Sequence, residues 1–376
     1  MKILKDLDVT GKRVFLRADL DVPLESTNDE RLTTNAESAT RLQNIKPTVD
    51  YLLEHGATQI IIAGHIDRPE KPDPKLSTKQ LVELLEKILG QKIEFVQDFT
   101  GPVSSFLPAS ARSNKLDPNS DSKSKELRAD GNPSTAATPK ILLFENLRFW
   151  PGEVGDSPEL ARELAALADI YVNDAFGNCH RAHASMIGVP KLLPHAAGLH
   201  LQLEVEKLTE LMTFPKKPYV AVIGGEKIET KVPVIHNLAR VADTVLVGGY
   251  LVAEIRGKKF EMQNFGTNVD IGTLTPDDED LDAQSTTKFT AVISTAATVV
   301  WNGPMGHFEA GFVKASLAVA QAIIESGAYS VVGGGETTQF LAKNNLLSKF
   351  SFVSSGGGAM LEFLAGKKLP GIEALT

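Results

Sequence analysis

The stretch 219–249, YVAVIGGEKIETKVPVIHNLARVADTVLVGG, decides the fold class. Its two ends, YVAVIGG and TVLVGG, are short runs rich in β-branched residues that finish in paired glycines, and a helix-period segment lies between them. A strand, a helix and a second strand in this order form the crossover unit of a parallel sheet. Because the same alternation recurs in both halves of the chain, the sequence predicts an α/β protein.

Similar runs predict the remaining strands. They are TVVWNG (298–303), SVVGGG (330–335) and SFVSSGGG (351–358) in the second half, and RVFLRADL (13–20), QIIIAG (59–64), ILLFENL (141–147) and IYVND (170–174) in the first. One helix is expected to begin at Ser77, with Gln80 completing a capping box, and another at Ser157 with Pro158 in its first position.

The length of 376 residues favours two domains over one. We expect an N-terminal domain over 1–189, a connection and long helix over 190–216, a C-terminal domain over 217–365, and a tail over 366–376 that returns to the N-terminal domain. The expected architecture is therefore two Rossmann-like parallel-sheet domains joined by a helix, with a cleft between them. Residues 104–139 are polar and are expected to form a surface insertion.

Composition excludes several classes of function. A net charge of −8 disfavours binding to nucleic acid or to an anionic membrane, because the field of the whole protein repels polyanions. The start of the chain lacks an apolar signal-like segment, and no stretch has the length of a membrane span. We therefore expect a cytoplasmic protein. Its single cysteine, Cys179, excludes an internal disulfide framework and is expected to be a packing residue.

The glycines at the strand ends indicate a phosphate ligand. In open parallel sheets ligands bind beyond the carboxyl ends of the strands, where glycine lets backbone N–H groups and helix N-termini approach a phosphate. Five such ends in the second half predict a polyphosphate site. The P-loop, the dinucleotide fingerprint and the protein-kinase motifs are all missing from the sequence, so this site follows another design.

Basic residues stand at strand ends or adjacent turns in the first half. Each of them alone could form an ordinary surface ion pair. The set together predicts an anion site, because one guanidinium can bind two oxygens of a carboxylate or phosphate at once. The set consists of Arg17, Arg41, His65, Arg68, Arg148, His180 and Arg181.

Nine ordered motifs resemble phosphoglycerate kinases from the first strand to the C-terminus. Two of them, NDAFGNCHRAHAS (173–185) and WNGPMGHFE (301–309), are nearly specific to that family. The others are VFLRADLDVPL, TRLQNIKPTVDYLLEHGA, GHIDRPE, FENLRFWPGEVGD, AVIGGEKIETKVPVIHNL, VVGGGETT and FVSSGGGAMLEFLAGKKLPGIEAL. The resemblance implies reversible phosphoryl transfer between ATP/ADP and 3-phosphoglycerate/1,3-bisphosphoglycerate in glycolysis, by a monomer that uses Mg²⁺ with the nucleotide.

The resemblance also implies a role for individual positions. The catalytic residues would be Arg41, Lys227, Gly357 and Gly358. The acid substrate would be bound by Arg17, Asp19, Asp21, Arg41, His65, Arg68, Arg148, His180 and Arg181. The nucleotide would be bound by Gly225, Lys227, Lys231, Gly248, Gly249, Asn302, Pro304, Glu309, Gly334, Gly335, Glu336 and Thr337, with Glu336 also holding the metal.

Five residues depart from the family pattern within these motifs. They are Asp21 for an asparagine, Asp67 for a glycine, Glu226 for a small residue, Tyr250 for a glycine and Glu336 for an aspartate. The segment between Leu251 and Val299 is also shortened to a polar stretch, which predicts poor discrimination between ATP and GTP. These departures leave two alternatives open: a binding or regulatory protein with weakened catalysis, and a kinase for a different small acid.

Overall fold

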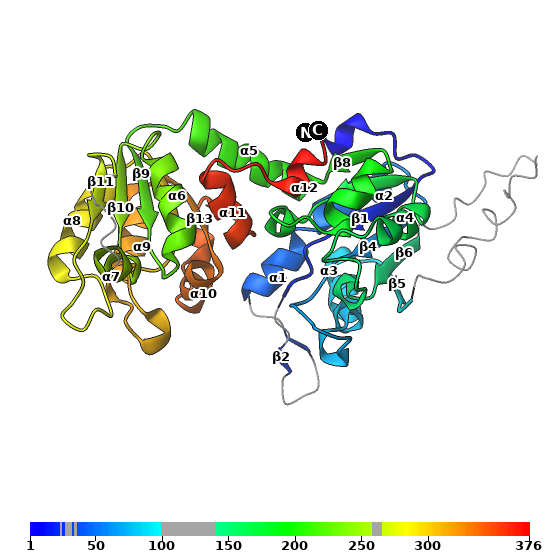
Figure 1. Cartoon of the computed structure of the whole chain (residues 1–376), viewed down its shortest axis with the longest axis horizontal. Coiled ribbons are helices and arrows are strands. Elements are labelled where there is room, and N and C mark those ends of the chain that lie inside the picture. Colours follow the sequence, from blue (N-terminus) through cyan, green and yellow to red (C-terminus); the bar gives the residue numbers. More distant parts are fainter. Residues whose placement is uncertain (23–24, 27–31, 34–35, 99–139, 258–264) are drawn as a thin grey trace, which may run out of the picture.

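The computed structural model describes residues 1–22, 25–26, 32–33, 36–98, 140–257 and 265–376. The whole of the predicted insertion at 104–139 therefore lies outside the described residues. Figure 1 shows two lobes side by side, each built on a sheet covered by helices. A separate antiparallel pair joins β2 (Glu25–Ser26) to β3 (Leu32–Thr33).

The first lobe contains a six-stranded sheet in which every neighbouring pair is parallel. Its spatial order is β5 (Ile93–Val96), β6 (Lys140–Phe144), β4 (Gln59–Ala63), β1 (Arg13–Arg17), β7 (Ile170–Asn173) and β8 (His195–Ala197). The helices of this lobe are α1 (Ala36–Gln43), α2 (Lys46–Glu54), α3 (Val82–Leu89) and α4 (Pro158–Ala166).

The second lobe contains another six-stranded parallel sheet. Its order is β11 (Val269–Ile271), β10 (Thr244–Val247), β9 (Tyr219–Ile223), β12 (Thr298–Asn302), β13 (Tyr329–Gly333) and β14 (Phe352–Val353). Its helices are α6 (Ile228–Leu238), α7 (Leu251–Gly257), α8 (Ala283–Ile293), α9 (Lys314–Ser326), α10 (Gly335–Lys343) and α11 (Gly357–Leu364). The two parallel sheets confirm the predicted fold class.

Alternate residues of the central strands face opposite helical layers. In β1, Val14 and Leu16 pack into the core cluster that contains Val49 of α2, whereas Phe15 joins the cluster that contains Leu160 of α4. Parallel strands that are buried on both faces have nearly continuous apolar sequences. This pattern explains why the sequence identified the central strands without ambiguity.

Local capping bears out one predicted helix start and corrects the other. Ser157 accepts a hydrogen bond from the Leu160 backbone amide (3.3 Å), and Pro158 opens α4 as expected. Ser77 instead caps a 3₁₀ turn, Thr78–Leu81, by accepting from the Lys79 amide (3.2 Å). The predicted capping box is not formed: the Ser77 amide donates to the carbonyl of Pro74 (3.3 Å), and the Gln80 side chain donates to the carbonyls of Lys75 (2.7 Å) and Ser77 (3.5 Å) and accepts nothing from the Ser77 amide.

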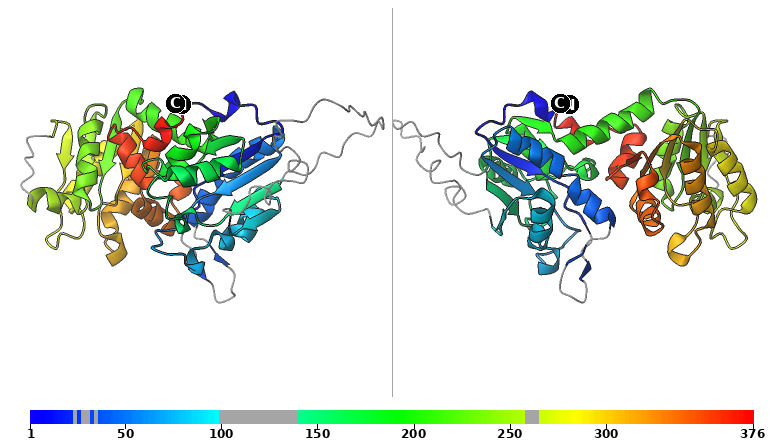
Figure 2. Two further views of the ribbon diagram at one scale, coloured as in Figure 1. Left: turned by 45° about the vertical axis from the view of Figure 1, so that its right-hand side comes forward. Right: turned by 180° about the vertical axis from the view of Figure 1, so that it is seen from behind.

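Helix α5 (Leu199–Thr213) runs between the two lobes, as Figure 2 shows from two further directions. The two chain ends lie together beside the first lobe, where α12 (Pro370–Glu373) packs (Figure 1). The Lys2 amide donates to the carbonyl of Leu375 (2.8 Å), and the Gly371 amide to that of buried Cys179 (2.8 Å). These bonds hold the C-terminal tail against the first lobe.

The segment between Leu251 and Val299 has more structure than the sequence predicted. Its described part contains α7, β11 and α8. Asp282 caps α8 by accepting from the Ser285 amide (2.7 Å), and Phe289 and Ile293 of that helix are fully buried. The expectation of a merely polar stretch was wrong, because three-residue β11 and capped α8 give weak signals beside the surrounding polar residues.

None of the helices in the described residues combines the length and the apolar character that a membrane crossing requires.

Candidate active site

The strand orders place a topological switch point in each sheet. In the second sheet β9 leads outward to β10 and β11, whereas β12 lies on its other side. In the first sheet β1 lies between β4 and β7. Ligands of open α/β sheets bind outside the carboxyl ends of strands at such points, so the residues that follow β1, β4, β7, β9 and β12 are the ones to consider.

A cavity of about 520 Å³ lies between the lobes and is lined by both. The first lobe contributes Asp19, Asp21, Arg41, Arg68, His180 and Arg181; the second contributes Lys227, Gly357 and Gly358. Figure 1 shows α1 of the first lobe facing the side of the second lobe that carries α10 and α11. Arg41, in the last turn of α1, donates from a guanidinium nitrogen to the carbonyl of Asp21 (2.7 Å).

Arg17 and His65 lie behind this cavity and do not line it. Arg17 is fully buried, donating from Nε to the Ser185 hydroxyl (3.0 Å) and lying 3.0 Å from His65 Nδ1. Glu153, also fully buried, accepts from the Ser185 hydroxyl (2.5 Å). Arg148 is half-buried and donates to the carbonyl of Asp67. Arg17 and Arg148 therefore act on the cavity through their charge, and His65 acts through its contacts with Arg17 and Asp21.

The cations of the first lobe lower one another's pKa. Burial, and then the charge of Arg181, lower the pKa of Arg148 to about 10. Burial and the charge of Arg68 lower the pKa of Arg181, and burial followed by Arg17 lowers that of His65 well below its ordinary value. Such shifts mark a region of positive potential, which a bound anion would relieve.

Asp21 and Asp67, two departures from the family pattern, are bonded to each other. The Asp67 amide donates to Asp21 Oδ1 (2.8 Å), and Asp67 has a φ of 54°, a left-handed conformation that aspartate tolerates better than most residues. Asp21 Oδ2 also lies 3.7 Å from His65 Nε2. Burial, followed by the Asp19 charge, raises the pKa of Asp21 despite this amide bond.

A second cavity, of about 280 Å³, forms a groove in the second lobe that is lined by glycines and two lysines. We name it the phosphate groove; its lining includes Gly225, Lys227, Lys231, Asn302, Gly334, Gly335, Glu336, Thr337, Gly357 and Gly358. Both α10 and α11 begin at it, so the positive ends of two helices are directed toward the same space. Gly334 has a φ of 102°, which only glycine adopts readily, and this turn exposes the first amides of α10.

Lys231 is the buried cation of the phosphate groove. Its Nζ donates to the Asn302 side-chain oxygen and lies 3.3 Å from the Asn302 carbonyl. Burial lowers its pKa to about 8, and the charge of Glu336 opposes this shift. Lys227 precedes α6, is exposed, and lines both the phosphate groove and the cavity between the lobes.

Gly248 and Gly249 belong to the backbone packing behind the groove. A Cβ on Gly249 would lie 2.6 Å from the Pro304 carbonyl oxygen, and one on Gly248 would lie 2.6 Å from Met305 Sδ. The strand ends of β10 and β12 therefore touch through glycine. A third, small cavity of about 30 Å³ lies beside this contact, and its lining includes Tyr250, Pro304, Glu309 and Glu336.

Among the described residues, His, Cys, Asp and Glu side chains do not gather in threes in a way that would hold a metal ion. Glu336 is the acidic side chain of the phosphate groove that stands in the first turn of a helix. A single carboxylate suits Mg²⁺, which binds through one or two carboxylates together with substrate phosphates.

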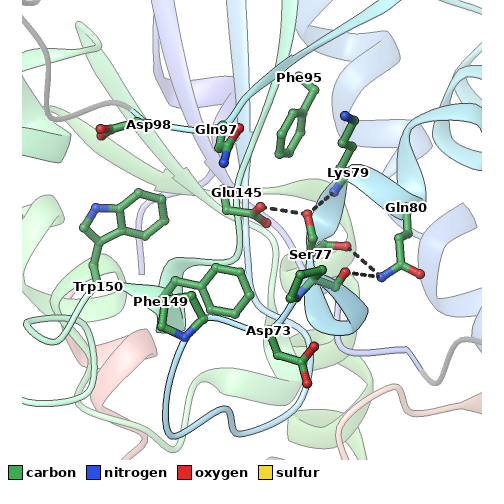
Figure 3. A pocket seen from close by; sticks show the side chains of 12 residues that line it. Asp73, Ser77, Lys79, Gln80, Phe95, Gln97, Asp98, Glu145, Phe149 and Trp150 are labelled. Atoms are coloured by element: carbon green, nitrogen blue, oxygen red, sulfur yellow. Dashed lines mark hydrogen bonds between the residues drawn. The ribbon is translucent and has the colours of Figure 1, made fainter.

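A larger cavity, of about 870 Å³, opens on the first lobe (Figure 3). Its charged side chains are those of Asp73, Asp98 and Glu145 against one lysine, Lys79, so it does not suit a phosphate. Glu145 accepts from the Ser77 hydroxyl (2.7 Å; Figure 3) and from the Thr78 amide (2.9 Å). This carboxylate thus connects β6 to the turn before α3, and we assign the cavity no part in the chemistry.

Several residues around the site were missed by the sequence reasoning. Asn178 donates to Asp19 Oδ1 (3.4 Å), and Ser185 links Arg17 to Glu153. Both stand in the motif NDAFGNCHRAHAS, in which the resemblance implied roles only for His180 and Arg181. Glu279 was missed altogether, because its contacts with Tyr250 and His307 span 29 and 28 positions of the sequence.

The arrangement defines a class: two-lobed α/β proteins that present two anion-binding surfaces to one cleft. A family model described as phosphoglycerate kinase matches residues 4–116, 125–259 and 253–367. A phosphoglycerate kinase of Solibacter usitatus is 36% identical over 415 residues, covering 99% of this chain and 98% of that protein. One of Moorella thermoacetica is 36% identical over 419 residues with the same coverage.

Solved structures agree. The chain matches that of phosphoglycerate kinase from Coxiella burnetii with a TM-score of 0.75 and 30% identity, covering 99% of this chain and 98% of that one. It matches the enzyme of Pyrococcus horikoshii with a TM-score of 0.76 and 26% identity, covering 100% and 98%. The chain belongs to the phosphoglycerate kinase family. This membership confirms the predicted family and its class of enzyme, and these relatives lend no support to a non-catalytic alternative.

Proposed function

We propose that the protein transfers a phosphoryl group reversibly between ATP/ADP and 3-phosphoglycerate/1,3-bisphosphoglycerate, with each ligand on one lobe. The observation that carries this proposal is the cavity shared by the lobes, in which Arg41 and Arg181 face Lys227 and the glycine turn at 356–358. Membership of the family supports the reaction. Each lobe has its own set of basic residues, which supports the assignment of one ligand to each lobe.

The acid substrate occupies the first-lobe side of the cavity in this proposal. Arg41, Arg68, His180 and Arg181 bind its carboxyl and phosphate oxygens, because they line the space and are charged or polar. Asp19 holds the substrate hydroxyl. Arg17 and Arg148 raise the local positive potential from behind, the neutral His65 ring contacts Arg17, and Asp21 lowers this potential.

The nucleotide phosphates occupy the phosphate groove. Lys227 and Lys231 neutralise their charge, and the first amides of α10 and α11 bind their oxygens. Asn302 keeps Lys231 pointed into the groove through its side-chain oxygen. Gly225, Gly248, Gly249, Pro304 and Glu309 form the side on which the nucleoside would lie.

We assign the metal of this reaction to Mg²⁺, carried with the nucleotide and held at Glu336. When bound, Mg²⁺ would neutralise charge on the nucleotide phosphates, and Glu336 would be its protein ligand. The first-turn position of Glu336 and its place in the phosphate groove support this role.

Transfer itself needs positioning and charge stabilisation more than covalent help from the protein. Arg41 approaches the transferring phosphoryl group from the first lobe and Lys227 from the second. The amides of Gly357 and Gly358 bind its equatorial oxygens. Water must be excluded while the group moves, so we propose that the lobes close over the two ligands, with α5 as the connection that bends.

The remaining assignments follow from this reaction. We propose that residues 1–189 bind the acid, that 217–365 bind the nucleotide, and that 190–216 and 366–376 join the two. The proposed enzyme works in the cytoplasm. It acts as a monomer, because the residues of one chain line both ligand surfaces.

A coupled assay with 3-phosphoglycerate and Mg·ATP tests the proposal, together with titrations of each ligand. We expect turnover that saturates with both substrates. Binding of both ligands without turnover would instead identify a binding or regulatory protein. Turnover that appears only with another small acid would identify a different kinase.

A further inference from the structure

Tyr250 stands directly after the glycine pair at the end of β10, and its ring is held at two points. Its hydroxyl donates to Glu279 Oε2 (2.6 Å) and lies 3.0 Å from His307 Nδ1. The Tyr250 and His307 rings meet edge to face, with centroids 5.3 Å apart. The hydrogen bond to Glu279 raises the pKa of Tyr250 to about 12, so the hydroxyl remains a donor at neutral pH.

The two partners of Tyr250 belong to loops that are themselves joined. The His307 amide donates to the Glu279 carbonyl (2.9 Å), and Asp280 forms an antiparallel bridge with Gly306. His307 Nδ1 also lies 3.0 Å from Glu279 Oε2. Tyr250 therefore crosses from the end of β10 to a fixed structure beyond the end of β12.

The space beside the ring is nearly closed. The cavity lined by Tyr250, Glu226, Pro304, His307 and Glu309 measures about 30 Å³, whereas the adjoining phosphate groove measures about 280 Å³. The two share Gly225, Glu226 and Glu336, so they are consecutive parts of one site. The small cavity has room for one or two water molecules and none for a purine ring.

We propose that Tyr250 closes the subsite for the nucleotide base, so that this chain selects its phosphoryl donor by the polyphosphate and binds a base-free polyphosphate as tightly as ATP. The inference rests on the proposed function, which assigns the donor phosphates to the phosphate groove and the nucleoside to the side next to it. A base could enter only if Tyr250 gave up its bonds to Glu279 and His307. The phosphate contacts of Lys227, Lys231 and the helix N-termini are unaffected by that ring.

Isothermal titration of the full chain tests the proposal, with Mg·tripolyphosphate, Mg·ATP and Mg·GTP as separate ligands. In the wild type we expect the three dissociation constants to agree within about threefold, or less than 0.7 kcal/mol. Tyr250→Gly should lower the dissociation constant of Mg·ATP at least tenfold and change that of Mg·tripolyphosphate by less than twofold. Tyr250→Phe keeps the ring but loses both bonds, so it should tighten ATP by a smaller factor.

Two control variants complete the experiment. Tyr329→Phe alters a tyrosine at the start of β13, at the far end of the sheet from the groove, and should change no constant. Lys227→Met should weaken all three ligands by a similar factor, because each would use the phosphate groove.

Three results would overturn the inference: wild-type preference for ATP over tripolyphosphate beyond about tenfold, weaker ATP binding in a folded Tyr250→Gly or Tyr250→Phe variant, or loss of ATP alone in Lys227→Met. The coupled assay keeps the two proposals separate. Equal binding constants without turnover of 3-phosphoglycerate would contradict the proposed reaction and still support the closed base subsite.

Discussion

Arg41 reaches the cavity between the lobes from a position that its own element determines. It stands in the last turn of α1, and its bond to the Asp21 carbonyl directs the guanidinium along the cavity wall. The opposite wall carries Lys227 and the start of α11. A guanidinium that meets the phosphoryl group only during transfer stabilises the transition state and adds little to binding of the nucleotide.

We therefore expect Arg41→Ala to lower kcat by about two to three orders of magnitude, similar to the loss of an oxyanion donor, and to leave the dissociation constant of Mg·ADP within about twofold. Steady-state kinetics and a nucleotide titration check this. Arg162→Ala, on the exposed face of α4, is the matched control and should behave as the wild type. Equal kcat for the two variants would remove Arg41 from the mechanism.

Asp21 adds a carboxylate to the side of the cavity that we assign to the acid substrate. Its raised pKa means that the charged form is disfavoured in the folded protein, and that its repulsion of the substrate grows as the pH rises through this pKa. Asp21→Asn removes the charge and can still accept the bond from the Asp67 amide.

We expect Asp21→Asn to lower the KM for 3-phosphoglycerate several-fold at about pH 8, since one unit charge nearby contributes on the order of 1 kcal/mol in a partly solvated site. The difference should shrink as the pH falls, because Asp21 of the wild type becomes protonated. A pH series of KM for both proteins measures this. A constant ratio at every pH would show that Asp21 does not titrate beside the substrate.

Lys231 predicts a pH dependence at the other end of the site. Burial holds its pKa at about 8, below the ordinary value, so the free site loses this cation as the pH rises through that range. A bound polyphosphate raises the pKa again, and binding takes up a proton. Affinity should therefore be full below about pH 8 and fall above it, by at most about tenfold per pH unit for one linked proton. Titrations of tripolyphosphate from pH 7 to 10 test this, and Lys231→Met should bind weakly without this slope.

At the scale of secondary structure, strand length decided what the sequence could predict. The central strands were found because they are apolar and buried on both faces, as Val220, Ala221 and Val222 of β9 are. Strands β5, β8 and β11 were not predicted: Glu94 interrupts the first, and the other two have three residues each. Such strands form because a neighbouring edge is ready to pair with them, which is a tertiary effect.

In the candidate site too, some features could be predicted from the sequence and others could not. Residues that follow a strand could be placed from sequence, because parallel strands end at one edge of the sheet, as Arg181 after β7 and Lys227 after β9 do. The burial of a side chain could not be predicted. Arg17 was expected to contact the substrate, but it is fully buried against Ser185. Partnerships across loops, such as that of Tyr250 with Glu279, depend on side-chain geometry that no local pattern encodes.

The cap of α8 tests whether this unexpected helix contributes to the second lobe. Asp282→Ala removes the acceptor of the Ser285 amide and should lower the free energy of unfolding by about 1 kcal/mol. Thr287→Ala, at an exposed position of the same helix, is the control and should change it by less than about 0.5 kcal/mol. Urea unfolding followed by circular dichroism gives both values; equal midpoints would mean that α8 is stabilised by burial of Phe289 and Ile293 alone.

At the scale of the whole molecule, the lobes come into close contact through Gly356 and Gly177. A Cβ on Gly356 would lie 2.8 Å from the Cα of Gly177, and one on Gly177 would lie 2.7 Å from Asp19 Oδ2. Close by, the Ser355 amide donates to Glu204 of α5 (2.6 Å), and the Ser355 hydroxyl lies 3.0 Å from His200 Nε2. The turn that opens α11 is therefore fixed to the connecting helix and pressed against the loop that carries His180 and Arg181.

Gly356→Ala should separate these two loops without removing a side chain that we assign to a ligand. The added methyl group meets the backbone at Gly177 and the ring of Phe176, neither of which can move as a flexible side chain would. Because transfer depends on alignment across the cleft, a displacement of about 1 Å lowers kcat by roughly a hundredfold, while each ligand alone should bind within about twofold of the wild type. Gly155→Ala, whose new Cβ would meet nothing within 4 Å, is the control and should retain full kcat. If Gly356→Ala also retained full kcat, the glycine contact would not set the alignment of the lobes, and closure would have to be guided by α5 and Ser355.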